Sequence, residues 1–390
     1  MNGPADTLAR LIRREGPIPF DVFVEHALYE PGGFFASGRG AGRDAADFIT
    51  APEVGPLFGA LMARALDCEW DALETPDPFV VVEAGAGRGR LAADVLRAEP
   101  RCLPALRYVL VERSPALREA LRERLRLEPP DEAFGPFAAG PDAPVPVPAS
   151  GPVVTALDEL PGVEFDGVVV ANELLDNLPF GIACRTESGW AEVRVGLNDE
   201  GEFVEVVVPT RPGDAAALAR ITAGAAPPAV GARLPIPRGI EEWLRRVATM
   251  LRHGTVVLFD TMDTVAGVLA RGDEWLRTYR AHGRAGDPLA APGTRDVVSD
   301  VVVEQLRHAA TDAGFVVAAE RTQAEWLADL GIDALVDEGR DLWTAHAATG
   351  DLVGLEGRSR ATQAAALTDP DGLGAHRVVV LSKGMGLRGR

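Results

Sequence analysis

Apolar runs that each end in an acidic residue predict buried parallel strands in this chain. Residues 79–82 are apolar at every position and precede Glu83, and residues 108–111 form a second such run before Glu112. Continuous apolar runs are typical of strands buried on both faces of a parallel sheet. Between the two runs stand an amphipathic helix and, before it, three glycines at alternate positions: Gly85, Gly87 and Gly89. This order is the plan of a nucleoside site at the carboxyl edge of a parallel sheet.

The alternation of strands and helices continues to the end of the sequence. Further strands are expected at residues 167–171, 255–260, 315–319 and 377–382. Helices are expected at residues 115–125, 240–251 and 301–313. The pattern predicts an α/β fold with a doubly wound, mostly parallel, Rossmann-like sheet, in which residues 377–382 form a final antiparallel edge strand.

The remaining segments do not fit a minimal nucleoside-binding domain. Within residues 1–75 the pattern predicts helices at 20–28 and 56–73, with loops around them. We expect this segment to form an N-terminal helical lid on a domain of residues 76–390. That domain carries cap insertions at about 186–237, 263–297 and 323–375. The first insertion opens with a hairpin around residues 198–201 and continues, over the proline-rich residues 209–237, as a loop or linker.

The residue types around the glycine loop favour S-adenosylmethionine (SAM) over a dinucleotide. The dinucleotide fingerprint would have its third glycine where this chain has Arg90. A carboxylate at Glu83 would repel a pyrophosphate, whereas SAM offers an ammonium and a sulfonium. Glu112 is placed to accept hydrogen bonds from both ribose hydroxyls. The alternative is an ordinary tight turn that needs glycine for positive φ.

A second informative stretch, residues 165–179, predicts a strand that delivers polar groups to the same edge of the sheet. Asn172 and Glu173 end the strand, and Asp176 follows. We expect these three side chains to serve catalysis, with Asn172 also near the cofactor, because two acids and an amide converge where the methyl group should point. The alternative is local, with Asn172 capping a helix and Glu173 in its first turn.

Two other regions offer candidate cofactor contacts. Thr50 and Glu53 lie in a segment that either touches the methionine end of SAM, as part of a lid hinged at residues 38–42, or simply caps the next helix. Asp158 is expected near the adenine, with a surface turn as the alternative.

Composition narrows the class of protein. The chain has 390 residues and a formal net charge of −19, which opposes sequence-independent binding of nucleic acid and is compatible with a cationic partner. Three widely spaced cysteines form no disulfide framework, and six single histidines show no metal-ligand spacing. No apolar run approaches the ~20 residues that span a bilayer, and the N-terminus lacks a signal-peptide core. We therefore expect a cytoplasmic protein without a metal site.

The chain resembles the MidA family of SAM-dependent methyltransferases. The most specific matches are Asp47-Phe-Ile-Thr-Ala-Pro-Glu53 and Asn172-Glu-Leu-Leu-Asp-Asn-Leu-Pro179. Further matches are spread over nearly the whole chain, at residues 31–35, 83–89, 276–280, 287–289, 292–293, 322–323 and 330–332. The chain departs from the family pattern at three places: Ala46, residues 259–262 and residues 298–300. Within residues 259–262 only Asp260 matches the family.

The resemblance implies a seven-stranded methyltransferase sheet, SAM as cofactor and methylation of an arginine on a protein substrate, since the family includes an arginine-methylating assembly factor of mitochondrial complex I. Glu173 and Asp176 would grip the guanidinium and Asn172 would orient it. Two alternatives stay open: a small-molecule O- or N-methyltransferase, and a SAM-binding assembly factor without turnover. The sequence leaves open whether the chain forms a homodimer.

Overall fold

The computed structural model describes residues 3–38, 50–134, 151–223, 227–280, 283–349 and 351–384. Its central sheet has seven strands in the order β16-β17-β10-β5-β2-β3-β4. Their bounds are β2 Phe79–Ala84, β3 Leu106–Val111, β4 Val153–Leu157, β5 Phe165–Asn172, β10 Leu251–Asp260, β16 Val316–Thr322 and β17 Arg377–Lys383. Strands β4, β3, β2, β5 and β10 run parallel, which confirms the mostly parallel α/β sheet.

Strand β17 runs antiparallel to both of its neighbours, β10 and β16. The expected edge position of this strand is wrong, because β16 lies outside it and pairs in the described chain with β17 alone. An antiparallel strand begins at the edge where its parallel neighbours end. The residues just before Arg377 therefore lie at the carboxyl edge of the sheet. The sequence also gave no expectation for β4, a short strand whose last two residues are only half-buried.

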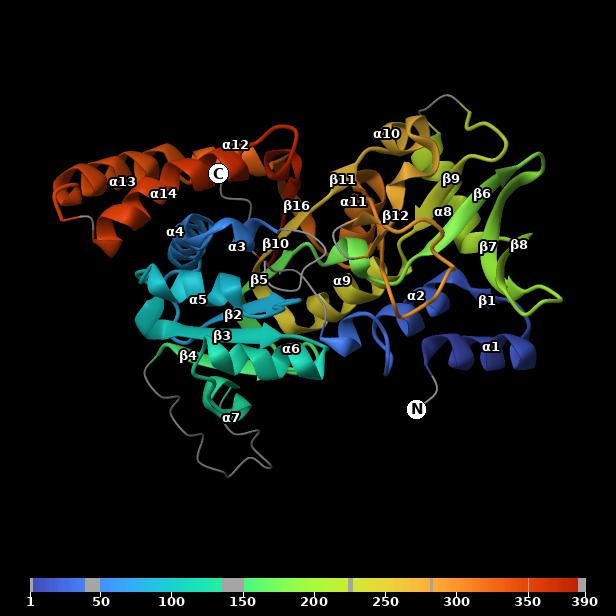
Figure 1. Cartoon of the computed structure of the whole chain (residues 1–390), viewed down its shortest axis with the longest axis horizontal. Helices are drawn as coiled ribbons and strands as arrows, with labels where there is room; N and C mark the ends of the chain where they lie inside the picture. The colour runs from blue at the N-terminus through green and yellow to red at the C-terminus, as the bar shows by residue number, and fades with distance from the viewer. Residues whose placement is uncertain are drawn as a thin grey trace.

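Helices cover both faces of the central sheet (Figure 1). One face packs against α4 Pro56–Ala72, α5 Arg90–Arg97, α12 Gln323–Asp329 and α13 Ile332–His346. The other face packs against α9 Arg238–Met250 and α11 Val303–Asp312. Apolar side chains of β2 alternate between the two cores, with Val81 in the first and Val80 and Val82 in the second. The sheet is therefore buried on both sides, which confirms the doubly wound arrangement.

A second, antiparallel sheet lies at the far end of the molecule from α13 (Figure 1). Its strands are β1 Ile18–Pro19, β6 Gly181–Thr186, β7 Gly189–Leu197, β8 Phe203–Pro209 and β9 Arg233–Ile236. The β7–β8 hairpin confirms the expected turn, where the Asn198 side chain accepts hydrogen bonds from the backbone N–H groups of Glu200 and Glu202. Residues 209–237 differ from the expected loop, since they contain β9 and the helix α8 Pro212–Thr222. Pro212 stands in the first turn of α8, where proline is tolerated.

The described part of residues 1–75 contributes to two different cores. Helices α1 Pro4–Glu15 and α2 Phe20–Leu28 pack on the second sheet in a core of their own. Helix α4 packs instead on the central sheet with α5. The short helix α3 Ala51–Val54 precedes α4. The segment is therefore not one separate layer over the sheet.

The two later insertions form small subdomains. The insertion at 263–297 holds α10 Val265–Ala270 and a three-stranded sheet of β12 Leu276–Arg280, β13 Gly283–Arg284 and β14 Asp296–Ser299. It is flanked by the paired short strands β11 Met262–Asp263 and β15 Val301–Val302. The insertion at 323–375 holds a hairpin of α13 and α14 Leu352–Leu367. The remaining short helices are α6 Pro115–Ala120 and α7 Pro130–Phe134.

Two close contacts fix the α13–α14 hairpin. The helices cross at a pair of glycines, where a Cβ on Gly357 would lie 2.5 Å from the carbonyl oxygen of Gly339. The buried Gln363 of α14 accepts a hydrogen bond of 2.9 Å from the backbone N–H of Leu57 in the first turn of α4. The hairpin is thereby tied to the helices that follow Thr50.

Replacing Gly357 by alanine should destabilise the protein. The added methyl group would meet a backbone oxygen that cannot rotate away, so we expect a loss of about 1–3 kcal/mol in the free energy of unfolding, as for other overpacked sites. Urea unfolding provides the measurement. Gly213→Ala in α8 is the matched control, because a Cβ there meets nothing within 4 Å. Equal stability of the two variants would contradict the tight crossing.

Candidate active site

A cavity of about 860 Å³ opens at the carboxyl edge of the central sheet, where the neighbouring strands β2 and β5 end. Its wall includes most of the residues expected from the sequence: Thr50, Glu53, Glu83, Gly85, Gly87, Glu112, Asp158, Asn172 and Glu173. The fold thus brings five separate stretches of the chain to one place. Gly89 and Asp176 do not line the cavity.

The glycine loop requires glycine at all three positions. Gly85, Gly87 and Gly89 have φ values of 74°, 54° and 70°, in the region that other residues rarely adopt. A Cβ on Gly87 would meet no atom within 4 Å, so the bare backbone there borders the open cavity. A Cβ on Gly89 would instead lie 2.8 Å from Leu121. Gly87 therefore shapes the cavity, whereas Gly89 allows close packing at the start of α5.

Glu83 supplies a buried carboxyl group at the end of β2. The residue is 5% exposed, and the hydroxyl of Tyr108 donates a hydrogen bond of 2.8 Å to it. Burial raises the pKa of Glu83 to about 8, although the Tyr108 hydrogen bond acts in the opposite direction. A cationic ligand group in the cavity would favour the ionised form. The site therefore fits the positive charges of SAM.

Glu112 links β3 to the glycine loop. Its carboxylate accepts hydrogen bonds from the backbone N–H groups of Gly87, at 2.9 Å, and Ser114, at 2.8 Å. Burial raises its pKa, and these two hydrogen bonds lower it. Each carboxylate oxygen keeps a further lone pair, so Glu112 can hold the loop and still accept hydroxyl groups of a ribose.

Thr50 and Glu53 reach the cavity from α3. Thr50 is the N-cap residue of that helix, yet its hydroxyl makes no capping hydrogen bond, so the capping alternative lacks its expected contact. Thr50 is buried and lines the cavity with Glu53. Residues 39–49, which hold most of the expected lid, lie outside the described residues. The lid therefore stays a prediction.

The chain turns sharply at the end of β5. Glu173 has a φ of 50°, and its backbone N–H donates to the carbonyl oxygen of Phe259 on β10. The short 3-10 helix η4 Leu175–Asn177 begins only after Leu174, so Asn172 caps no helix. Because Glu173 precedes η4, it shares no helical face with Asp176. The turn leaves Asn172 and Glu173 in the cavity wall and Asp176 outside it.

Three carboxyl groups lie together at this turn: Glu173 and Asp176, which are half-buried, and Asp260, which is buried. Asp260 ends β10, is 0% exposed, and accepts hydrogen bonds from the backbone N–H groups of Leu175, at 2.8 Å, and Asp176, at 3.3 Å. Burial, then the charge of Asp176, raises the pKa of Glu173 to about 8. Burial also raises the pKa values of Asp176 and Asp260. Acids with raised pKa values at a cavity are typical of functional sites.

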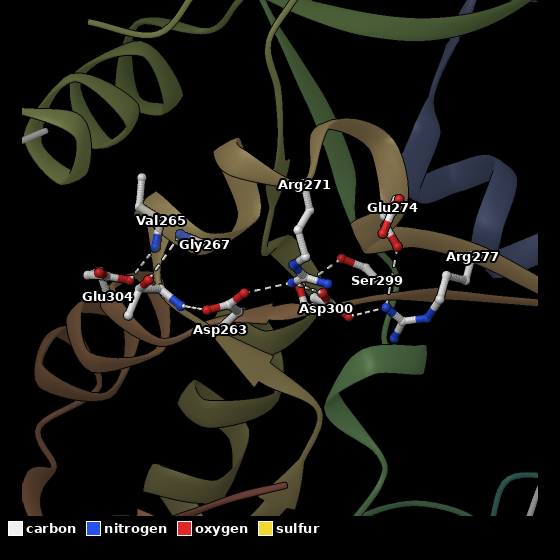
Figure 2. Close-up of polar contacts among 10 residues, drawn as sticks. Asp263, Val265, Gly267, Arg271, Glu274, Arg277, Ser299, Asp300 and Glu304 are labelled. Carbon is white, nitrogen blue, oxygen red and sulfur yellow. Dashed lines mark hydrogen bonds and ion pairs between the residues drawn. The ribbon is translucent and has the colours of Figure 1, made fainter. Parts of the chain in front are cut away.

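An ion-pair network that includes Arg277 and Asp300 lies within electrostatic range of Asp176 (Figure 2). The buried carboxylate of Asp300 lies between the guanidinium groups of Arg277 and Arg271, and Arg271 also pairs with Asp263 at 2.7 Å. Arg277 opposes the burial effect at Asp176 by lowering its pKa. Asp300 lies in a segment that departs from the MidA pattern. Its two arginine partners explain how a charged residue is buried there.

Helix α2 supplies cavity residues that the sequence did not indicate. Glu25 pairs with Arg113 at 2.5 Å, and the Arg113 guanidinium lies 4.3 Å from the centre of the Tyr29 ring. The Tyr29 hydroxyl donates a hydrogen bond of 3.0 Å to the carbonyl oxygen of Asn177. Helix α2 therefore joins the loop after β3 to the turn after β5. These partners are far apart along the chain, so no spacing signal could have revealed them.

Other classes of site find no support among the described residues. In those ranges, no cluster of histidine, cysteine and acidic side chains is arranged to hold a metal ion. The helices there are too short or too polar to cross a bilayer. Cys68, Cys102 and Cys184 are all free thiols.

Comparison with known proteins identifies the family. A family model described as S-adenosyl-L-methionine-dependent methyltransferase matches residues 61–320. The chain belongs to this family. It is a MidA-family methyltransferase, and SAM is its cofactor. A protein from Burkholderia thailandensis, whose crystal structure contains S-adenosyl-homocysteine, is 29% identical, with a TM-score of 0.79 over 98% of this chain and 92% of that chain. A second structure from the same organism is 28% identical, with a TM-score of 0.76 over the same shares.

Curated relatives of this MidA-family chain carry a more specific name. A Drosophila melanogaster protein named protein arginine methyltransferase NDUFAF7 homolog, mitochondrial, is 28% identical over 80% of this chain and 71% of its own length. The Danio rerio protein arginine methyltransferase NDUFAF7, mitochondrial, is 28% identical over 84% and 76%. These names contradict the expected cytoplasmic location, because the curated relatives are mitochondrial proteins. Widely spaced cysteines and the lack of a signal-peptide core, on which that expectation depended, do not distinguish one reducing compartment from another.

Replacing Glu112 by alanine should weaken the binding of S-adenosyl-homocysteine. The variant loses a charged hydrogen-bond acceptor for the ribose and also frees the Gly87 N–H, so we expect a cost of about 1–3 kcal/mol. Isothermal titration calorimetry provides the measurement. Glu119→Ala, whose side chain is 79% exposed, is the control and should bind like the wild type. Undiminished affinity of the Glu112 variant would contradict its place in the cofactor site.

The raised pKa of Glu83 predicts a pH dependence of SAM binding. Below pH 8 the free protein holds Glu83 mostly protonated, whereas a bound ammonium or sulfonium favours the carboxylate. Affinity should therefore rise from pH 6 to 8, by up to about tenfold per pH unit, and level off above. Calorimetry in two buffers of different ionisation enthalpy should detect the released proton. In Glu83→Gln the pH dependence and the proton release should both disappear. A flat wild-type profile would contradict the assignment.

Proposed function

We propose that this methyltransferase N-methylates arginine side chains of a protein substrate. The observation that carries the proposal is the Glu173 carboxyl group in the cavity wall at the end of β5, with Asp176 and the buried Asp260 beside it. The names of the curated relatives, which are arginine methyltransferases, support the same acceptor. The net charge of −19 favours approach of a cationic partner.

The chemistry of arginine explains why acids are needed at this place. A guanidinium stays protonated at neutral pH and its charge is delocalised over three nitrogens, which makes each nitrogen a poor nucleophile. The Glu173 carboxylate can accept hydrogen bonds from the guanidinium and localise its charge. The amide of Asn172, whose Oδ1 is buried without a hydrogen-bond partner, can accept another N–H and orient the acceptor. Asp176 acts on Glu173 through its charge.

The cofactor-facing residues take complementary roles in this proposal. Glu83 faces the ammonium, Glu112 the ribose and Asp158 the adenine, while Thr50 and Glu53 contact the methionine end. When bound, SAM supplies an electrophilic methyl group on its sulfonium. The protein's own contribution is to align the acceptor nitrogen with that group and to exclude water.

The proposal is tested with SAM that carries an isotopically labelled methyl group. Purified enzyme is incubated with a protein extract, and the products are digested and analysed for methylarginine by mass spectrometry. We expect labelled methylarginine with the wild type and with the exposed control Glu119→Gln. Glu173→Gln should lower the rate at least about 10²-fold, because it removes the charge that activates the acceptor, and should leave the affinity for S-adenosyl-homocysteine within a few-fold.

Other outcomes separate the alternatives. Label in small molecules and not in protein would indicate a small-molecule methyltransferase. Tight SAM binding with no transfer to any acceptor would indicate an assembly factor without turnover. Either result would contradict the proposed function.

A further inference from the structure

Glu173 is surrounded by buried polar atoms that have no hydrogen-bond partner. These are Oδ1 of Asn172, Oδ1 of Asp176 and Nδ1 of His376. Nδ1 of His376 lies 4.0 Å from the Glu173 carboxylate. The first two residues neighbour Glu173 in sequence, but His376 comes from the other end of the chain. Its imidazole has a different chemistry, because it can exchange a proton with Glu173 near neutral pH.

The topology of the sheet explains why His376 reaches this place. Strand β17 begins at Arg377, opposite Asp260 of β10, and runs antiparallel. The residue before it therefore lies at the carboxyl edge, next to the turn after β5. The carbonyl oxygen of His376 accepts a hydrogen bond of 2.7 Å from the backbone N–H of Gln323, so the backbone is fixed. Its side chain is only 19% exposed.

The charged groups around Glu173 and His376 come from three segments. Glu173 and Asp176 follow β5, and Asp260 ends β10. Arg277 on β12, which pairs with Asp300 (Figure 2), also acts on the imidazole through its charge. Burial, then the charge of Arg277, lowers the pKa of His376. This lowered pKa favours the neutral imidazole, which can accept a proton.

We propose that His376 is a positioning residue of the transfer, which takes from Glu173 the proton that the acceptor nitrogen releases. The inference rests on the proposed function for the identity of that acceptor. As the nitrogen–carbon bond forms, the carbon–sulfur bond breaks and sulfur keeps its electron pair. The nitrogen loses one N–H proton to the Glu173 carboxylate, which passes it to Nδ1 of His376, and the imidazolium releases it to water. The methylated guanidinium keeps its single positive charge, so atoms and charge balance.

The separation of 4.0 Å is longer than a hydrogen bond, and apo sites commonly tighten when substrate binds. A guanidinium against Glu173 favours its carboxylate form, which strengthens the attraction between Glu173 and a protonated imidazole. The proton therefore leaves the acceptor site without crossing the cavity.

The first test detects the pair without any acceptor. Protein labelled with ¹³C at histidine Cε1 is titrated by NMR with S-adenosyl-homocysteine bound, and His376→Gln identifies the His376 signal. The signal should show an inflection near pH 8, where Glu173 ionises. The inflection should be lost in Glu173→Gln. His308, whose Nδ1 is also buried without a partner, is the internal control and should show none. Absence of the inflection from His376 would overturn the proposal.

The second test uses the pH profile of methylation. In His376→Gln, Glu173 must lose its proton directly to water, so kcat at pH 7 should fall about 10²-fold and recover toward the wild-type value above pH 8.5. KM for the acceptor and the affinity for S-adenosyl-homocysteine should stay within about threefold of wild type. His308→Gln should match the wild type. If His376→Gln does not fold, His376→Asn replaces it, with retained S-adenosyl-homocysteine binding as the criterion.

The outcomes separate this inference from the proposed function. If His376 had a merely structural role, His376→Gln would lower kcat equally at all pH values. If His376 had no role, the pH profile of the variant would match that of the wild type. Either result would overturn the inference and leave arginine methylation standing. If the wild type methylates no arginine, the proposed function fails, and the NMR inflection still decides whether His376 is coupled to the ionisation of Glu173.

Discussion

The buried carboxyl group of Asp260 fixes the turn after β5, on which the proposed acceptor site depends. It ends β10 and accepts backbone hydrogen bonds from Leu175, Asp176 and Thr261. These donors offset part of the cost of burying an acid, although burial still raises its pKa. The same strand accepts the N–H of Glu173 through Phe259, which holds Glu173 at a positive φ. Without these contacts between neighbouring strands, the turn after β5 would lose the hydrogen bonds that hold Glu173 in the cavity wall.

The rest of the site is arranged around this turn by elements from distant parts of the chain. Helix α2 braces it through Tyr29, and the insertion after β10 places Arg277 behind it. The α13–α14 hairpin contacts α4 through Gln363 and so supports the segment that carries Thr50 and Glu53. The cofactor half needs fewer such contacts, because Glu83, the glycine loop and Glu112 are held by two adjacent strands and their own connection.

This difference in the number of long-range contacts explains which parts of the site the sequence could predict. The strands β2, β5 and β10, the glycine loop and the acids at its ends follow from local patterns, because each lies within one strand–turn–helix unit. The sequence also predicted that Asn172, Glu173 and Asp176 would converge, but the turn at Glu173 leaves only the first two in the cavity wall. Tyr29 follows α2, Arg277 lies on β12 and His376 immediately precedes β17. Their positions depend on the order of strands in the sheets. The sequence does not reveal that order, so no periodicity or spacing along the chain indicates these three residues.

The placement of β17 also determines when the protein can become complete during synthesis. Strand β16 is made before β17 but lies outside it, so in the described chain β16 has no partner in the sheet until the last strand is in place. Closing such a long-range pairing is slow, because the entropy of ordering the intervening residues is lost before the contacts form. The nascent chain on the ribosome can assemble β2, β3, β5 and β10 and their glycine loop early. The β10–β17–β16 part of the sheet is finished only after residues 377–383 have left the ribosome, so a polypeptide terminated before them would contain β2, β3 and the glycine loop but lack β17.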